Sequence, residues 1–327
     1  MKTSRLSRES GATLLSVLLV ITLMSAAALA ATDALARSVS VSRTSGYRAD
    51  SFWAVRGALA AGEQVVNELL ASLQGNLAAD SSLLREPVTL PYERTSIIIS
   101  LRDASNCFNL NSIEGDEGTG RGGKAPLRSL RTLYEEAGIY GNEARQLTDS
   151  LADWIDADTS TRPSGAEDPL YRSRAIPHRT GGQKLLSVAE VRAVEGYTSE
   201  VMARLDGLVC VRRAESETLL NINTLTLSQA PLLPALFSRE LSITEAERII
   251  SLRPEGGWAN VGEFLSLPDI MKIAPEMRSD QVLSVASNHV EADIVISSPA
   301  GATRITALYG RMADGSFVLQ DAYRRSS

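Results

Sequence analysis

One uncharged apolar stretch stands out near the start of the chain. Residues 12–31 contain no Asp, Glu, Lys or Arg. In a helix that rises 1.5 Å per residue they reach about 30 Å, the hydrocarbon thickness of a bilayer. The leader before this stretch, residues 1–11, holds three basic residues against Glu9, a net charge of +2. The positive-inside rule therefore predicts a cytoplasmic N-terminus and an exported remainder.

Three kinds of N-terminal segment fit this pattern. A cleaved signal peptide has an apolar core of about 7–15 residues, shorter than the one found here. A signal anchor would simply remain uncut. In the third kind, Gly11 marks the site where a peptidase on the cytoplasmic face cuts, so that the mature chain begins with its own membrane helix at Ala12. That layout is typical of type IV pilin-like precursors.

Helix-compatible spacing of apolar residues continues beyond the membrane stretch without a proline. The pattern predicts one helix over residues 12–74, with 12–32 in the membrane, and Gly75 is a plausible stop. Such a helix would be about 90 Å long. Pilin-type subunits use a stem of this kind to pack into a filament. A membrane anchor followed by an amphipathic linker helix is the alternative.

Strand patterns occur on both sides of a long helical segment. β-branched runs at 97–99 and 294–296, and near-alternation at 303–309, predict strands within residues 75–107 and 288–327. The segment between them contains short helical patterns. We therefore expect an α+β fold in which a pilin-like N-terminal helix packs on a small antiparallel sheet, and a large all-α domain is inserted into the sheet.

The inserted segment contains three pairs of similar short sequences in the same order. They predict two modules, at 108–210 and 211–287, built as helix-hairpin-helix or SAM-like repeats. In the second pair each member is expected to begin a helix behind a Ser/Thr capping candidate. The paired segments are 109–113 with 221–225, 147–151 with 243–247, and 187–191 with 260–264.

Helix-hairpin-helix modules raise the alternative of a membrane-anchored DNA-binding receptor. DNA-binding versions offer backbone N–H groups from a glycine-containing hairpin to a phosphate. The corresponding segment here, 235–241, has no glycine and contains Glu240, and the whole chain has a net charge of −6. A basic surface, which nucleic-acid binding normally requires, is missing from this composition. We therefore expect no nucleic-acid partner.

An acidic segment is the main candidate for chemistry. The two histidines and two cysteines are too widely spaced for a four-ligand Cys/His zinc site of the usual spacing. Asp156, Asp158, Ser160 and Glu167 occupy positions 1, 3, 5 and 12 of an EF-hand-like loop, although Thr161 replaces its glycine. The oxygen-rich set predicts a hard-cation site, with calcium as the ion expected outside the cytoplasm. A solvated acidic loop and the carboxylate pair of an anchored periplasmic hydrolase are the alternatives.

Cys107 and Cys210 lie shortly before the two Asn-rich segments of the first pair, 109–113 and 221–225. In an exported protein, two cysteines at similar points of a duplicated module are disulfide candidates. A closed loop of about 100 residues would stabilise the fold by about 4–5 kcal/mol in the chain-entropy model. Two buried free thiols are the alternative.

Taken together, the chain resembles the minor pseudopilin K family of the type II secretion system, also called general secretion pathway protein K. The resemblance covers nearly the whole length. It rests on GATLLSVLLV at 11–20, on LADWIDAD and GAED within 151–168, and on LNINT at 220–224.

The resemblance implies how the N-terminus is processed and where the subunit sits. A prepilin peptidase would cleave between Gly11 and Ala12, and Ala12 would be N-methylated. Most pilin-like proteins have Glu at the fifth mature position, which is Ser16 here. An unpaired terminal ammonium in lipid is costly, so the missing glutamate fits a subunit with no neighbour above it. A bulky insert would also clash in a repeating filament.

The resemblance further implies a non-enzymatic tip subunit that caps the periplasmic pseudopilus and helps to initiate its assembly for export across the outer membrane. It would be a single-pass inner-membrane protein with a cytoplasmic N-terminus and a periplasmic body. The expected partners are minor pseudopilins I and J, the remaining pseudopilus, the inner-membrane platform and prepilin peptidase. Structural calcium is carried over onto Asp153, Asp156, Asp158, Glu167 and Asp168.

Overall fold

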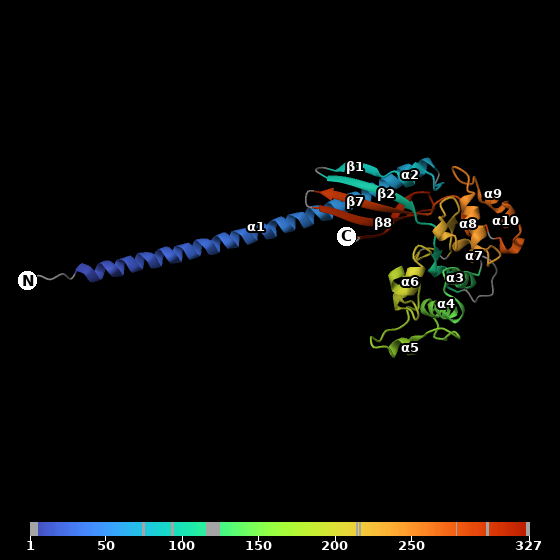
Figure 1. The fold of residues 1–327 in the computed structure, drawn as a ribbon, viewed down its shortest axis with the longest axis horizontal. Coiled ribbons are helices and arrows are strands. Elements are labelled where there is room, and N and C mark those ends of the chain that lie inside the picture. Colours follow the sequence, from blue (N-terminus) through green and yellow to red (C-terminus); the bar gives the residue numbers. More distant parts are fainter. Residues whose placement is uncertain are drawn as a thin grey trace, which may run out of the picture.

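A computed structural model describes residues 6–73, 76–92, 95–115, 125–213, 215, 217–278, 280–298 and 301–324. Three parts follow one another in space (Figure 1): a long helix, a sheet against which the end of that helix packs, and a mainly helical domain. The start of the long helix and the helical domain lie at opposite ends of the described part of the molecule.

The long helix α1 runs from Leu6 to Ser72, over 67 residues, and is about 100 Å long. It begins within the leader rather than at residue 12, because nothing between Leu6 and Ala12 interrupts a helix that propagates cooperatively. The predicted stop, Gly75, lies outside the described residues. The membrane-compatible part of α1 is fully exposed, whereas its last turns are buried against the sheet.

The sheet is antiparallel, as the sequence predicted, and it takes its strands from both ends of the chain. The two β-branched runs pair directly, with Ile97 opposite Ile296 and Ile99 opposite Ile294. This pairing joins sequence segments that lie about 200 residues apart. The strand order is β1 (Val88–Tyr92), β2 (Thr95–Asp103), β7 (His289–Ser298), β8 (Gly301–Arg311) and β9 (Phe317–Arg324).

A close contact fixes α1 on the sheet. The Tyr309 hydroxyl of β8 donates to the backbone carbonyl of Leu59 at 2.9 Å. Gly62 makes the approach feasible, since a Cβ at that position would lie 2.5 Å from the Tyr309 hydroxyl oxygen. Around this contact, Val66, Ile294 and Tyr309 are fully buried. The stem and the sheet therefore share one core.

The helical domain enters and leaves through neighbouring strands. Asp103, the last residue of β2, lies opposite Val290 near the start of β7. The inserted domain, residues 104–287, is thus attached at one end of a strand pair and has its own hydrophobic core. Its α-helices are α3 (Pro126–Glu136), α4 (Gly141–Ile155), α5 (Asp168–Arg172), α6 (Ser199–Arg204), α7 (Leu232–Leu236), α8 (Ile243–Ser251), α9 (Val261–Leu265) and α10 (Pro268–Met271), and a short α2 (Ser82–Arg85) precedes β1.

The inserted domain is not purely helical, contrary to the prediction. Each half contains one short parallel strand pair, too short to give a sequence pattern. In the first half β3 (Phe108–Asn109) pairs with β4 (Val209–Cys210). In the second half β5 (Leu220–Asn221) pairs with β6 (Leu283–Ser284). Single 3₁₀ turns complete the domain, at Leu110–Ile113, Val188–Ala193, Leu227–Gln229 and Pro275–Met277.

An asparagine makes the same reciprocal contact in each half. Asn111 accepts from Leu185 N–H at 2.8 Å and donates to the Leu185 carbonyl at 3.1 Å. Asn223 accepts from Trp258 N–H at 2.8 Å and donates to the Trp258 carbonyl at 2.9 Å. The sequence similarity between segments 109–113 and 221–225 thus corresponds to one repeated hydrogen-bond arrangement.

The second pair of segments, 147–151 and 243–247, does not occupy equivalent positions in the two helices, contrary to the prediction. Ile243 is the first residue of α8, whose N-cap Ser242 accepts from Glu245 N–H. The first residue of α4 is Gly141, so Leu147 lies inside that helix, six residues after the position that matches Ile243. Thr148 misled the prediction, because its hydroxyl donates to the Ala144 carbonyl within the helix instead of capping it.

Candidate functional site

The acidic segment connects two helices of the first half. Asp153 lies in the last turn of α4, and Asp156 is the residue that ends this helix. Glu167 is the N-cap of α5 and accepts from Asp168 N–H at 3.2 Å. The acidic residues therefore come from one helix end, the loop after it and the next helix start.

Three of the five predicted ligands come together. Asp156, Asp158 and Glu167 each offer a carboxylate oxygen, and these oxygens all lie within 4.8 Å of one another. Glu167 is buried, Asp156 is half-buried and Asp158 is exposed, so the group opens toward solvent. Glu167 Oε1 and Asp156 Oδ1 are buried without a hydrogen-bond partner. Orphaned buried carboxylate oxygens are what a bound cation would satisfy, and the residues therefore fit an oxygen-ligated ion.

The electrostatics of this group are unfavourable without a cation. Burial raises the pKa of the Glu167 carboxyl, and the charges of Asp156 and Asp168 raise it further. Burial and the charge of Asp158 likewise raise the pKa of Asp156. Arg162 opposes this repulsion, with Nη2 3.5 Å from Asp156 Oδ2. A divalent cation would offset the repulsion more fully than one arginine at that distance.

Asp153 organises the loop instead of joining the three carboxylates. It is fully buried and accepts from Arg162 N–H at 3.2 Å, with Arg162 Nε 3.3 Å from its Oδ1. Burial raises the pKa of Asp153 to about 6. Gly165 lies so close that a Cβ there would be 2.0 Å from Asp153 Oδ2. The glycine is therefore required by the buried carboxylate.

Asp168 also has a different role from the predicted one. Its Oδ1 accepts from Thr180 N–H at 3.0 Å, and its Oδ2 lies 2.7 Å from Arg172 Nη2. The Thr180 amide and the arginine nearby hold the pKa of Asp168 below its usual value. This carboxylate fastens the segment after α5 and is already neutralised.

One loop-organising residue was missing from the predicted ligand set. Asp149 Oδ2 accepts from Ser164 N–H at 3.1 Å, so Asp149 and Asp153 hold the loop from two successive turns of α4. The i, i+4 spacing of the two residues was the available signal, because it places them on one helix face.

The two cysteines form a disulfide. Cys107 and Cys210 are 103 residues apart, and Cys210 pairs with Asn109 in the β3–β4 ladder. The bond therefore encloses almost all of the first half, including the acidic loop. In the chain-entropy model a loop of this length stabilises the fold by about 4–5 kcal/mol.

The second-half hairpin lacks the features of a phosphate site. Arg239, the basic residue of segment 235–241, is paired with Glu135 and Glu136 of α3. Its backbone N–H donates to the Pro234 carbonyl at 2.9 Å. Both the charge and this amide are thus occupied within the domain, which weakens the DNA-receptor alternative.

One helix in the described part of the chain is long and apolar enough to span a membrane. It covers Thr13–Ser42, and none of its side chains is buried inside the protein. Gly11 and Ala12 precede it within the same helix α1. This segment has the length and composition of a single membrane anchor.

Comparison with known proteins yields one consistent family. Two models described as type II secretion system (T2SS), protein K, match residues 106–214 and 220–286. The type II secretion system protein K of Pectobacterium carotovorum subsp. carotovorum is 30% identical over 284 residues, 86% of each chain. That of Klebsiella pneumoniae is 34% identical over 269 residues, 81% of each chain.

A solved structure has the same fold. It is the crystal structure of the GspK–GspI–GspJ complex from the type 2 secretion system of enterotoxigenic Escherichia coli. The match has a TM-score of 0.71 and 26% sequence identity, and covers 86% of this chain and all of that chain.

Proposed function

The chain belongs to the type II secretion system protein K family and is a minor pseudopilin, and from this premise we propose that it caps the tip of the periplasmic pseudopilus and helps to initiate its assembly. One observation carries the proposal. The inserted domain is attached at the end of the sheet farthest from the membrane helix (Figure 1). Stacked subunits would have to accommodate this domain at every step, whereas a terminal subunit would not.

The N-terminal sequence supports the same position. Ser16 stands at the fifth position of the mature chain that begins at Ala12. A serine cannot neutralise the terminal ammonium of a neighbouring subunit in lipid as a glutamate can. The similar solved structure is a complex of three proteins, GspK, GspI and GspJ. By analogy, minor pseudopilins I and J are the proposed partners of this chain, together with the rest of the pseudopilus and the inner-membrane platform.

Counting labelled subunits along isolated pseudopili tests the tip position. We expect one gold label at one end of each filament when the label is attached after Arg324, beyond β9. A matched variant replaces residues 104–287 with a short turn, since Asp103 and Val290 already face each other in the sheet. With Ser16→Glu added, so that the neighbouring subunit's terminal ammonium can be neutralised, this variant should appear along the filament. Labels of the intact chain along the filament length would contradict the proposal.

For topology, we propose a single-pass inner-membrane protein whose N-terminus is cytoplasmic and whose body is periplasmic. The net charge of +2 on residues 1–11 and the apolar Thr13–Ser42 helix support this orientation. Prepilin peptidase would cleave after Gly11 and leave a methylated Ala12. Intact mass and N-terminal peptide mapping of the membrane fraction test this, and a chain that starts at Met1 would contradict it.

The acidic loop is proposed to hold structural calcium rather than to catalyse a reaction. Asp156, Asp158 and Glu167 would supply ligands, while Asp153 and Asp168 organise the loop around them. The orphaned oxygens of Asp156 and Glu167 support this assignment. Calcium at about 100 times its dissociation constant would add about 2.7 kcal/mol to the free energy of unfolding.

Thermal unfolding with and without a chelator tests the calcium proposal. Wild type should melt at a lower temperature in chelator, and Asp158→Asn should lose most of that difference. Asp206→Asn, an exposed carboxylate in the same half of the domain, is the matched control and should respond like wild type. Identical wild-type melting with calcium and with chelator would contradict the proposal.

We also propose that the two halves of the inserted domain are copies of one helical unit. The reciprocal bonds of Asn111 with Leu185 and of Asn223 with Trp258 support this. The parallel strand pairs, each of which joins the start of a half to its end, also support this.

A further inference from the structure

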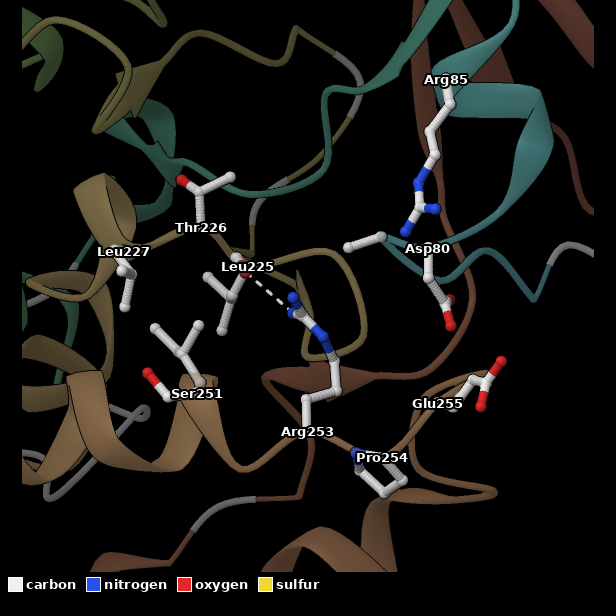
Figure 2. A pocket seen from close by; sticks show the side chains of 11 residues that line it. Asp80, Arg85, Leu225, Thr226, Leu227, Ser251, Arg253, Pro254 and Glu255 are labelled. Carbon is white, nitrogen blue, oxygen red and sulfur yellow. Dashed lines mark hydrogen bonds between the residues drawn. The ribbon is translucent and has the colours of Figure 1, made fainter.

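A pocket of about 410 Å³ lies on the side of the protein where the segment after α1 meets the second half of the inserted domain. None of the acidic-loop residues lines it, and it is separate from the candidate metal site. Figure 2 shows Arg85 and Asp80 on one wall and Leu225, Arg253 and Glu255 on the other.

The two walls are held together by hydrogen bonds that backbone N–H groups donate. Ala79 N–H donates to the Asn223 carbonyl at 2.9 Å. Gly256 N–H donates to Asp80 Oδ2 at 2.8 Å. Because these bonds do not depend on an occupant, the pocket is preformed, which lowers the ordering cost of binding.

Two guanidinium groups project between the walls (Figure 2). Arg253 is half-buried and donates from Nη1 to the Leu225 carbonyl at 2.8 Å. Arg85 is exposed at the other side. Within the described ranges, no carboxylate oxygen lies within 4.0 Å of either guanidinium group. Asp80 attracts both arginines without forming an ion pair with either. Both can therefore still donate to a carboxylate from another molecule, the anion to which arginine binds with planar, paired hydrogen bonds.

The rest of the lining selects among anions. Asp80 and Glu255 stand beside the arginines and would repel a phosphate dianion or a nucleic acid more than a single carboxylate. Leu227, which lines the pocket, is 56% exposed. This leucine would stay in water around a small inorganic ion, but an aliphatic side chain would cover it.

We propose that the Arg85–Arg253 pocket binds a polypeptide segment of a partner protein that presents one Asp or Glu side chain beside an aliphatic side chain. The carboxylate accepts from both guanidinium groups, and the aliphatic side chain packs on Leu227. This inference goes beyond the tip position and does not require it, since binding can be measured on the isolated chain.

Selection from a displayed library of random ten-residue peptides on the purified full-length chain in detergent tests the proposal. Enriched peptides should share Asp or Glu next to Leu, Ile or Val. Their affinity for Arg85→Gln should fall about tenfold, which corresponds to about 1.4 kcal/mol for one lost charge-assisted contact. Arg253→Gln should lose at least as much.

Glu255→Gln is the matched control, because it changes the same pocket but removes a negative charge. Its affinity for the peptides should stay equal or rise. Arg85→Gln is less prone to misfold than Arg253→Gln, because the Arg85 side chain is exposed, whereas Arg253 donates a hydrogen bond to the Leu225 carbonyl. The proposal is overturned if no peptide is enriched, if acidic residues are not enriched, or if Arg85→Gln binds as wild type does. Displacement of every peptide by equimolar inorganic phosphate would also overturn it, in favour of a small-anion site.

Discussion

The two halves of the inserted domain use the same asparagine contact to enclose very different lengths of chain. Asn111 and Leu185 are 74 residues apart, whereas Asn223 and Trp258 are 35 residues apart. Much of the additional length lies in the acidic segment between α4 and the return to Leu185. A buried amide that closes a loop at its two ends tolerates growth between them, because loop-closure entropy rises slowly with length.

The two halves are also stabilised by different means. The first has a disulfide and carboxylates that bind loop amides. Aromatic packing is common to both, with the Trp154 and Tyr171 rings 5.2 Å apart in the first half and the Trp258 and Phe264 rings 5.0 Å apart in the second. The second half is also hydrogen-bonded to the sheet: Asp103 Oδ2 accepts from Asn221 Nδ2 at 2.9 Å and from Ser287 Oγ at 2.6 Å. The longer loop of the first half thus goes with a covalent restraint, and the shorter second half with hydrogen bonds to the sheet.

Removing the disulfide should produce the largest difference in stability between the two halves. We expect Cys107→Ala/Cys210→Ala to lose about 4–5 kcal/mol of unfolding free energy, because the unfolded chain regains the entropy of a 103-residue loop. Hydrogen exchange followed by peptide mapping should show faster exchange in α3 and α4 than in α8. Equal acceleration in both halves would mean that they unfold as one unit.

Substituting the two asparagines individually sharpens the comparison. Asn111→Ala and Asn223→Ala each leave a buried N–H and a buried carbonyl without their partner, at about 2–4 kcal/mol. Asn111→Ala should be the larger loss in chemical denaturation, because the Asn111 amide also donates to the Arg212 carbonyl at 3.2 Å. Reduction of the disulfide should leave the difference between the two variants unchanged, since the crosslink restricts the unfolded state of wild type and variant equally. A larger loss for Asn223→Ala would mean that the Arg212 contact contributes nothing measurable.

The buried Asp153 predicts that the first half loses stability as the pH rises, whereas in the second half the pKa values of Glu245 and Asp269 are lowered, which predicts the opposite sense. The pKa of Asp153 is about 6 when folded, above the ordinary value of 3.8, so the folded state holds the proton more tightly. In chelator, this group stabilises the fold at about pH 4 and loses that contribution as the pH rises through 6. Thermal melting from pH 4 to 7 should therefore decline more in wild type than in Asp153→Asn. Parallel curves would show that Asp153 does not titrate in this range.

The smallest expected difference concerns two matched loop contacts. Glu263 accepts from Ala259 N–H at 2.8 Å, and Glu190 accepts from Leu186 N–H at 2.8 Å. Glu190 also accepts from Trp154 Nε1 at 3.1 Å. We expect Glu263→Ala to cost about 0.5–1 kcal/mol and Glu190→Ala about twice as much by urea denaturation, because a second donor is lost. Equal losses would mean that the Trp154 contact contributes nothing measurable.

The sequence alone determined the features that depend on local pattern. The uncharged stretch after residue 11 and the β-branched runs at 97–99 and 294–296 identified the long helix and the antiparallel sheet, because helix and strand periods leave a direct trace in the order of residues. The family resemblance likewise rested on short contiguous segments.

Only the tertiary structure decided which carboxylates come together. Five acidic residues close in sequence looked equivalent, yet Asp156, Asp158 and Glu167 face one another while Asp153 and Asp168 bind backbone amides of the loop and of Thr180. The Arg85–Arg253 pocket also joins segments far apart in the chain. Such arrangements depend on the direction of side chains after packing and on distances across the fold, and neither is encoded by spacing along the chain.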